Sequence, residues 1–334
     1  MTVGAVAVAA LLLSSGLIVL LRPWLARHAL ASLTVRSSHE KPTPQGGGIG
    51  IIVATLTVTW IGVGLAPGAL QNTGGQFLAV TGAAVLLGVI GVIDDIRHTP
   101  TALRFVVQCV AVFAVIASLP ESLRVLPSIP FSLERVGLFI GGVWFVNLVN
   151  FMDGIDWMTV AEFVPVTAAI VLVGLSGAIA PLPTLLAAAL LGAIAGFAPF
   201  NRPTAKIFLG DVGSLSLGLI LGWLLLQLAE RGHLAAALIL PLYYLADATL
   251  TLIYRAARGE PFWRAHRMHF YQRAMDNGFT VGAVITRVFL VNMALAILGL
   301  LSVAVDTPAT SVASIIAAIG LVTWLLITFT RNKR

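Results

Sequence analysis

The chain has 334 residues, of which 58% are hydrophobic and only 10% are charged, with a formal net charge of +6. Soluble domains carry about 25% charged residues, so this composition excludes an ordinary soluble protein and favours a membrane protein. The basic residues lie in short loops rather than in one basic domain, which argues against a nucleic-acid-binding protein. The single cysteine, Cys109, cannot form an internal disulfide and is a poor basis for a metal site.

Apolar runs along the chain are long enough to cross a hydrocarbon core of roughly 30 Å as helices. Helices satisfy their own backbone hydrogen bonds, which lipid demands, and the runs do not alternate as the strands of a membrane barrel would. We therefore predict an all-α polytopic membrane protein with a single catalytic domain over 1–334. Its eleven predicted spans are 3–21, 46–66, 76–93, 101–118, 135–150, 158–178, 181–199, 212–229, 233–254, 280–302 and 308–329.

The distribution of basic residues predicts the orientation of these spans. Fifteen of the 20 Lys and Arg residues lie in the C-terminal tail or in loops that follow odd-numbered spans, and three lie in the opposite loops. The positive-inside rule then places the N-terminus outside and the C-terminus in the cytoplasm. The first run has no cleavage site of small residues, so we predict a retained helix rather than a signal peptide.

Five polar segments interrupt the apolar runs, and all five are predicted to lie on the cytoplasmic side. Such a one-sided cluster favours a single site for a metal ion and phosphate groups, whereas a transporter would place polar groups near the midplane. The segments are 39–47, 94–95, 147–156, 201–214 and 266–269.

Two of these segments offer carboxylates at the ends of predicted spans. Asp94 and Asp95 follow the third span, where they predict either a Mg²⁺ neighbourhood with a general base or a solvated acidic helix end. Asp211 stands at the start of the eighth span, flanked by Gly210 and Gly213. It is either an N-cap or a metal ligand beside diphosphate oxygens.

A third segment carries amides and carboxylates at a regular spacing. Asn147, Asn150, Asp153 and Asp156 are three residues apart, a spacing that places side chains on one face if the helix continues. This face would offer two amides and two carboxylates to a cation or a nucleotide. The alternative is an amphipathic helix end with a polar face.

The most basic loop contains His266, Arg267 and His269. Histidine and arginine donors suit phosphate oxygens, although such a loop could equally contact anionic lipid headgroups. Asp247 is predicted to lie within the ninth span. An intramembrane carboxylate is a candidate for function, and a structural partner such as a tyrosine of another helix is the alternative.

Together these segments resemble the polyprenyl-phosphate N-acetylhexosamine-1-phosphate transferases. This family includes enzymes that initiate O-antigen and enterobacterial common antigen synthesis and the phospho-N-acetylmuramoyl-pentapeptide transferase. The resemblance covers about 36–275, and 150–156 and 205–214 match most specifically. Residues 266–273 resemble the branch that starts lipopolysaccharide O-chains and lack the His-rich triplet of the peptidoglycan branch. Trp157 stands where many members have glycine, which leaves the sugar open.

The resemblance implies a multi-pass enzyme of the bacterial inner (cytoplasmic) membrane. Its active site would form at the cytoplasmic face, from loops near 36–47, 94–98, 147–158, 201–214 and 255–275. The implied reaction moves a sugar-1-phosphate from a UDP-sugar to undecaprenyl phosphate and releases UMP. The donor would be UDP-N-acetylglucosamine or a related 6-deoxy sugar, and the product would start an envelope glycan such as O-antigen.

The resemblance and the positions of the residues also suggest roles. Mg²⁺, or Mn²⁺ in its place, would be held mainly by Asp211 with Asn150 or Asp156 assisting. Asp94, supported by Asp95, would deprotonate or position the lipid phosphate. The residues expected to bind phosphate oxygens are Lys41, Lys206, His266, Arg267 and His269; those expected around the nucleotide are Asn147, Asn201, Phe208, Asp153 and Asp156.

Two other functions stay open at this point. The first is the phospho-N-acetylmuramoyl-pentapeptide transferase of peptidoglycan synthesis, and the second, from a different class, is a secondary transporter. Membrane lipids surround the chain in any of these cases. The oligomeric state is not readable from the sequence, and a homodimer is one option.

Overall fold

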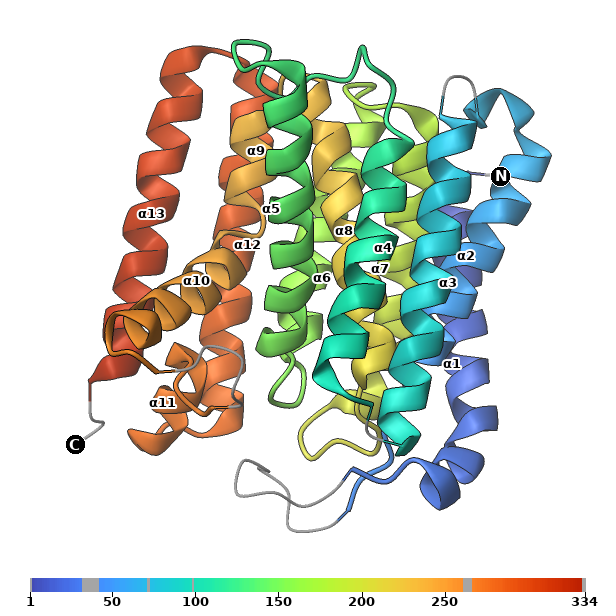
Figure 1. The fold of residues 1–334 in the computed structure, drawn as a ribbon, viewed down its shortest axis with the longest axis vertical. Helices are drawn as coiled ribbons and strands as arrows, with labels where there is room; N and C mark the ends of the chain where they lie inside the picture. Colours follow the sequence, from blue (N-terminus) through green and yellow to red (C-terminus); the bar gives the residue numbers. More distant parts are fainter. Residues whose placement is uncertain (1, 32–41, 71–72, 98, 261–265, 332–334) are drawn as a thin grey trace.

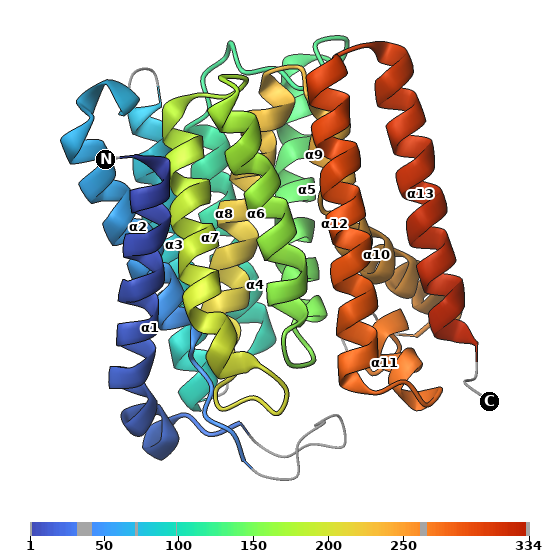
Figure 2. The same cartoon turned by 180° about the vertical axis from the view of Figure 1, so that it is seen from behind.

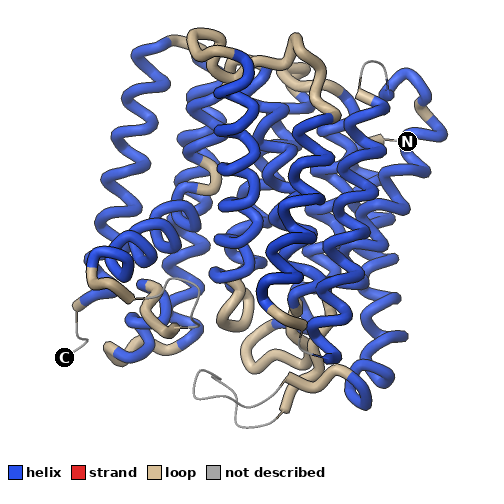
Figure 3. Tube along the Cα trace, viewed as in Figure 1, coloured by secondary structure: helices blue, strands red, loops and turns tan. Residues whose placement is uncertain are grey.

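The computed structural model describes residues 2–31, 42–70, 73–97, 99–260 and 266–331. Over these ranges the chain forms helices joined by turns and loops, and no β-strand (Figure 3). The helices are α1 (Val3–His28), α2 (Gly48–Leu65), the short 3₁₀ helix η1 (Pro67–Leu70), α3 (Gly74–Arg97), α4 (Thr101–Ala117), α5 (Phe131–Met152), α6 (Met158–Leu175), α7 (Pro181–Asn201), α8 (Asp211–Glu230), α9 (Leu234–Ile239), α10 (Leu242–Ala257), α11 (Phe270–Asp276), α12 (Val281–Val305) and α13 (Pro308–Thr330).

The long helices confirm the all-α polytopic fold. Within the described residues, nine helices are long and apolar enough to cross a membrane, and α4 is an apolar helix of 17 residues. Ten of the eleven predicted spans therefore correspond to one long helix each. The number of crossings and the orientation of the termini stay predictions.

The ninth predicted span, 233–254, was wrong as a single helix. It is divided into α9 and α10 by a turn at Leu240 and Pro241. Proline has no backbone N–H to donate and its ring clashes with the preceding turn, so a helix breaks there. Figure 1 shows the consequence, because α10 leaves the direction of α9 and crosses the edge of the bundle at a steep tilt.

Several helix starts follow from local sequence. Thr2, Thr280 and Thr307 are N-caps whose hydroxyls accept a hydrogen bond from the backbone N–H three residues later. Pro181 and Pro308 occupy the first turn of α7 and α13, where the missing N–H costs nothing. These signals explain why the boundaries of the apolar spans are close to those expected from the sequence.

Helix α8 is the most buried of the long helices and forms the centre of the bundle. It packs chiefly against α3 and α5, with α2 and α9 beside it. Helices α12 and α13 form one edge together with α10 and α11, and α1 lies at the opposite edge (Figure 2). The start of α8 is therefore enclosed by other helices at one end of the bundle.

Glycines allow the helices to approach α8 closely at its first turn. A Cβ atom on Gly91 of α3 would lie 2.3 Å from the backbone nitrogen of Val212, and one on Gly48 of α2 would lie 2.2 Å from the Cα of Gly213. Only residues without a side chain fit such contacts. The backbones of α2, α3 and α8 therefore meet where Asp211 begins α8.

We expect Gly91→Ala to destabilise the protein, because the added methyl group meets backbone atoms of Val212 that cannot move aside. Overpacking of this kind costs about 1–3 kcal/mol, which would appear as a lower thermal unfolding midpoint in detergent. Gly82→Ala is the matched control, since no atom lies within 4 Å of its added Cβ on the same helix. Equal midpoints for the two variants would contradict the close approach.

Where the structure describes them, the predicted polar segments lie at one end of the bundle, the lower end in Figure 1. The turns between α3 and α4, between α5 and α6 and between α7 and α8 are there, and so are α11 and the start of α2. The structure thus brings together the polar segments that the sequence predicts on one side of the membrane.

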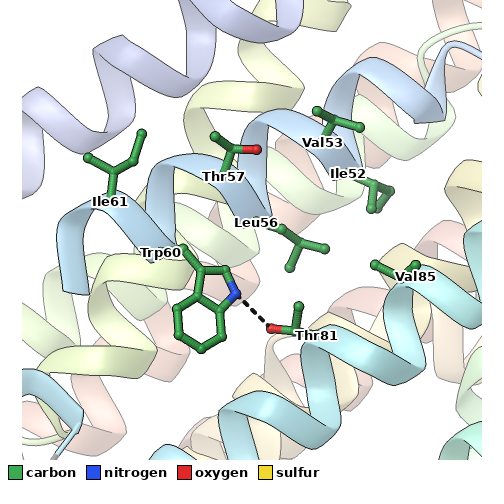
Figure 4. Close-up of a pocket in the computed structure, with 8 residues that line it drawn as sticks. All are labelled: Ile52, Val53, Leu56, Thr57, Trp60, Ile61, Thr81 and Val85. Carbon is green, nitrogen blue, oxygen red and sulfur yellow. Dashed lines mark hydrogen bonds between the residues drawn. The ribbon is translucent and has the colours of Figure 1, made fainter. Parts of the chain in front are cut away.

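A recess of about 590 Å³ lies elsewhere, between α2 and α3 (Figure 4). Its walls are apolar apart from Thr57 and the pair formed by Trp60 Nε1, which donates to Thr81 Oγ1 at 3.3 Å. No carboxylate and no cation lines this recess. Its lining therefore offers no groups for phosphate chemistry, and the candidate site lies at the polar end.

Candidate active site

The first turn of α8 is held by a carboxylate from α3. Asp95 Oδ1 accepts a hydrogen bond from the backbone nitrogen of Asp211 at 3.0 Å, and Oδ2 lies 3.5 Å from that of Val212. Gly210 precedes them with a φ of +78°, a conformation that favours glycine. Asp95 therefore satisfies the free N–H groups at the helix start. Asp211 is the first helical residue rather than the N-cap, so its side chain is available for other contacts.

Arg104 of α4 joins two carboxylates at this end. Its Nη1 lies 2.7 Å from Asp94 Oδ2 and 2.5 Å from Asp211 Oδ2. The other oxygen of Asp94 accepts hydrogen bonds from the backbone nitrogen and the hydroxyl of Thr99, both at 2.6 Å. Adjacent carboxylates repel each other unless a cation lies near, and Arg104 is that cation. The side chains of Asp94 and Asp211 remain 14% and 24% exposed, so solutes can reach them.

Asn150 of α5 completes this group. Its Nδ2 donates to Asp211 Oδ1 at 3.0 Å and to Ser214 Oγ at 2.8 Å. We call Asp94, Arg104, Asn150 and Asp211 the carboxylate cluster. Three of its members, Asp94, Asn150 and Asp211, are predicted site residues. Arg104 bridges Asp94 and Asp211, and Asn150 contacts Asp211 directly.

Arg104 was not among the functional residues predicted from the sequence. The available signal was a cation inside an apolar run, which is rarely without a role, followed four residues later by Gln108. Residues four apart share a helix face, and Gln108 Oε1 accepts a hydrogen bond from Asn147 Nδ2 at 2.7 Å. Asn147 thus contacts α4, and no hydrogen bond from its side chain to the carboxylate cluster is present among the described residues.

The prediction that four residues from Asn147 to Asp156 share one helix face was wrong for the last two. Helix α5 ends at Met152, so Asp153 and Asp156 lie in the turn before α6. Tyr271 packs against this turn at Gly154, where a Cβ would lie 1.9 Å from the Tyr271 hydroxyl.

Asp156 and Asn201 connect this turn to the loop before α8. Asp156 Oδ2 accepts a hydrogen bond from the backbone nitrogen of Ala205 at 2.9 Å. Asn201 Oδ1 accepts one from the backbone nitrogen of Trp157 at 2.8 Å, and its Nδ2 donates to the carbonyl of Ile207 at 3.0 Å. Both side chains are buried. These contacts shape the loops around the cluster, and the nucleotide-binding roles of the two residues stay predictions.

The loop 202–210 also pairs with the segment before α2. Phe208 donates from its backbone nitrogen to the carbonyl of Pro44 at 2.8 Å and accepts at its own carbonyl from Gly47 at 2.9 Å. The Phe208 side chain is half-buried, and Lys206 is exposed. Lys41 lies outside the described residues. The phosphate-binding roles of the two lysines stay predictions.

The histidine segment reaches the site through aromatic contacts. The His266 and His269 rings are tilted relative to each other with centroids 4.8 Å apart, and His269 lies 6.3 Å from the ring of Phe151 at the end of α5. Tyr271 donates its hydroxyl to the carbonyl of Phe151 at 3.2 Å. His269 is only 3% exposed, whereas Arg267 is half-buried and pairs with Asp276.

The chain is similar in sequence to several known proteins. Residues 77–229 match the model of glycosyl transferase family 4. A probable undecaprenyl-phosphate N-acetylglucosaminyl 1-phosphate transferase of Bacillus subtilis is 27% identical over 275 residues, which cover 78% of this chain and 74% of the relative. A decaprenyl-phosphate N-acetylglucosaminephosphotransferase of Mycolicibacterium smegmatis is 27% identical over 299 residues, covering 78% and 72%. The phospho-N-acetylmuramoyl-pentapeptide-transferase of Limosilactobacillus fermentum is 34% identical over 239 residues, covering 66% and 70%.

The chain belongs to glycosyl transferase family 4. The resemblance inferred from the motifs is confirmed, and so is the assignment of the chain as a transferase. The matched region contains every member of the carboxylate cluster, from Asp94 on α3 to Asp211 on α8.

Trp157, the departure from the glycosyl transferase motif, has a defined place. Its φ of +63° is left-handed, which is easy for glycine and unusual for a bulky residue. The indole Nε1 donates to the carbonyl of Ala198 on α7 at 2.6 Å. The indole therefore fastens the turn after α5 to α7, and the left-handed backbone gives a physical reason for glycine at this place in other members.

The cluster fits a metal ion that is shared with substrate. No group of three or more His, Cys, Asp or Glu side chains in the described part of the chain could hold a metal alone. However, Mg²⁺ is usually bound by one or two carboxylates together with water and substrate phosphates. Asp211 supplies one such carboxylate, and the Asn150 amide lies against it. Asp156 is tied to Ala205, so its assisting role stays a prediction.

Asp153 lies in the turn beside the cluster and titrates near neutral pH. Burial raises its pKa to about 7, the hydrogen bond from Thr159 Oγ1 at 2.5 Å opposes that rise, and the negative charges of Asp211 and Asp156 add to it. Asp153 is therefore about half ionised at pH 7, and the fraction increases with pH.

We expect Thr159→Val to move the acid limb of the pH–activity profile upward by about one pH unit. The lost hydrogen bond favours the ionised carboxylate, so its removal raises the pKa of Asp153 further. The measurement is the initial rate of transfer between pH 5 and 9. Thr167→Val is the control, because that hydroxyl bonds only within α6. An unmoved acid limb would show that Asp153 does not control the rate.

Proposed function

We propose that this chain transfers an N-acetylhexosamine-1-phosphate from a UDP-sugar to undecaprenyl phosphate at the cytoplasmic face of a bacterial inner membrane. The observation that carries the proposal is the carboxylate cluster at the polar end of a bundle of membrane-length helices. The names of two relatives specify transfer of an N-acetylglucosamine phosphate to a polyprenyl phosphate, which supports the same substrate class.

The reaction forms one phosphorus–oxygen bond and breaks another. An oxygen of the lipid phosphate attacks the phosphorus that carries the sugar, and the oxygen that links this phosphorus to the nucleoside phosphate leaves with UMP. Such a transfer depends on alignment of the attacking and leaving oxygens and on neutralisation of their charge. Mg²⁺, when bound by Asp211 with Asn150 beside it, would supply part of that neutralisation on the diphosphate.

Arg104 is suited to a second part of this task. Its guanidinium carries five N–H donors, and both recorded ion pairs use Nη1 alone. Donors of this group match phosphate oxygens in geometry and charge. Arg104 would therefore bridge the two carboxylates at rest and contact phosphate when substrate is present.

The role proposed for Asp94 is to act on the acceptor. Thr99 and Arg104 fix the orientation of both of its oxygens, so the carboxylate is held rigidly at the end of α3. A lipid phosphate is largely ionised at neutral pH, and positioning it is therefore the main task proposed for Asp94. Proton removal would matter only for the fraction that still carries a proton.

The biosynthetic pathway that the lipid-linked product enters is also a proposal. Residues 266–273 resemble the branch that starts O-chains of lipopolysaccharide, so the lipid-linked product would begin an envelope glycan such as O-antigen. The 34% identity to a phospho-N-acetylmuramoyl-pentapeptide-transferase favours a second candidate, in which the donor carries a pentapeptide.

The test is UMP release by the purified chain with undecaprenyl phosphate, Mg²⁺ and a panel of donors. The panel contains UDP-N-acetylglucosamine, its 6-deoxy relatives and UDP-N-acetylmuramoyl-pentapeptide. UMP release that requires lipid and an N-acetylhexosamine donor supports the proposal. Release with the pentapeptide donor alone favours the second candidate, and substrate flux in proteoliposomes without any UMP release would point to a transporter.

A further inference from the structure

The broken ninth span carries a carboxylate buried in the interior of the protein. Asp247 lies on α10 and is fully buried. A charge in such a place is costly unless donors surround it. Five donors do so: Tyr243 Oη and Thr251 Oγ1 from α10, the Nδ1 of His269, and the backbone nitrogens of Phe270 and Tyr271 at the start of α11.

The contact between Asp247 and His269 predicts a proton on one particular ring nitrogen. Nδ1 lies 3.2 Å from Asp247 Oδ1, and a proton on Nδ1 makes this contact a fifth hydrogen bond to the carboxylate. The second ring nitrogen, Nε2, is then the one left for another partner. Buried carboxylates that orient a functional histidine in this way are common outer partners of active sites.

Three aromatic rings also lie against the His269 ring. Tyr271 stacks on it at 5.8 Å between centroids, whereas His266 at 4.8 Å and Phe151 at 6.3 Å lie at a tilt to it. Phe151 follows Asn150, whose amide bonds Asp211 in the carboxylate cluster. The ring therefore lies near the end of α5, the helix that also carries Asn150.

We propose that Asp247 is a positioning residue for transfer, which holds Nδ1 of His269 and so orients the ring, and that Nε2 carries a proton and donates it in a hydrogen bond to the phosphate oxygens when substrate is bound. This inference rests on the proposed function, in which His269 binds phosphate. The competing explanation is purely structural: Asp247 would only hold the first two N–H groups of α11. The two explanations differ in whether the effect of changing Asp247 passes through His269.

A double-mutant cycle separates them. Asp247→Asn, His269→Ala and the double variant are compared by initial rates of UMP release, with kcat and KM for the UDP-sugar measured separately. We expect Asp247→Asn to lower kcat by about 10–100-fold and the double variant to be no worse than His269→Ala. Independent, multiplicative effects would overturn the proposal.

Two matched controls come from the same carboxylate. Tyr243→Phe and Thr251→Val each remove a hydrogen bond to Asp247 and leave its bond to His269 in place. We expect their kcat to stay within about threefold of wild type. If either control loses as much as Asp247→Asn, the carboxylate acts through general stability of this region and the proposal fails.

A measurement on the unaltered protein covers the case in which Asp247→Asn does not fold. Nitrogen-15 NMR of histidine-labelled protein reports the protonation of each ring nitrogen, and the His269→Ala variant assigns the signal among the six histidines. We expect a protonated Nδ1 at His269, and an unprotonated Nδ1 would overturn the proposal. Absence of UMP release from wild-type protein with every donor would instead contradict the proposed function.

Discussion

Asp211→Asn is expected to reduce UMP release by about 10³-fold or more, roughly 4 kcal/mol of transition-state stabilisation. Asp211 contacts two other members of the carboxylate cluster, because Arg104 donates to one of its carboxylate oxygens and Asn150 donates to the other. Asparagine keeps the shape but removes the charge that would hold Mg²⁺. It also turns an NH₂ group toward a donor, so one partner loses its acceptor.

The measurement for Asp211→Asn is the initial rate of UMP release together with yield and thermal unfolding in detergent. Glu230→Gln is the matched control, since it removes the same charge from the opposite end of α8. We expect the control to have wild-type turnover and both variants to insert normally. Turnover like wild type in Asp211→Asn would remove Asp211 from the metal role.

Asp94→Asn is expected to lower turnover by about 10²–10³-fold while UDP-sugar binding is retained. Asp94 is held by Thr99 and Arg104 rather than by the first turn of α8. Its loss therefore releases one side of Arg104 and leaves Asp211 and Asn150 in contact. The acceptor phosphate would be misplaced, whereas the donor would keep its binding groups.

Two separate assays distinguish these effects for Asp94→Asn: calorimetric binding of the UDP-sugar and the rate of UMP release at saturating donor. Asp306→Asn serves as the control, because Asp306 is exposed in the turn between α12 and α13, and asparagine tolerates its left-handed φ of +46°. If nucleotide binding disappears in Asp94→Asn, Asp94 belongs to the donor and metal site instead.

Much of the fold was predictable because the bilayer imposes a simple rule. Apolar runs of sufficient length must be helices, so ten of the predicted spans agree with single long helices. The exception was the run 233–254, whose composition is mostly apolar. Pro241 was the visible signal, yet hydropathy alone does not show that the two halves change direction there.

The residues of the candidate site were easier to predict from the sequence than the contacts between their side chains. Motif spacing identified Asp94, Asn150 and Asp211, and the structure places them around one arginine. Arg104 itself was missed because its partners, Asp94 on α3 and Asp211 on α8, are 10 and 107 residues away along the chain. Contacts between distant segments leave no periodic signature.

The sequence by itself determined the class of this protein, its helical spans and the polar segments at one end, because each of these depends on local composition and on the cost of polar groups in lipid. Only the tertiary structure decided which polar side chains meet. It assigned Asp95 to the start of α8, left Asp211 open to Arg104 and Asn150, and buried Asp247 against His269. The physical reason is that these pairs form through close packing of helices far apart in sequence, at glycines such as Gly91, where backbones can touch.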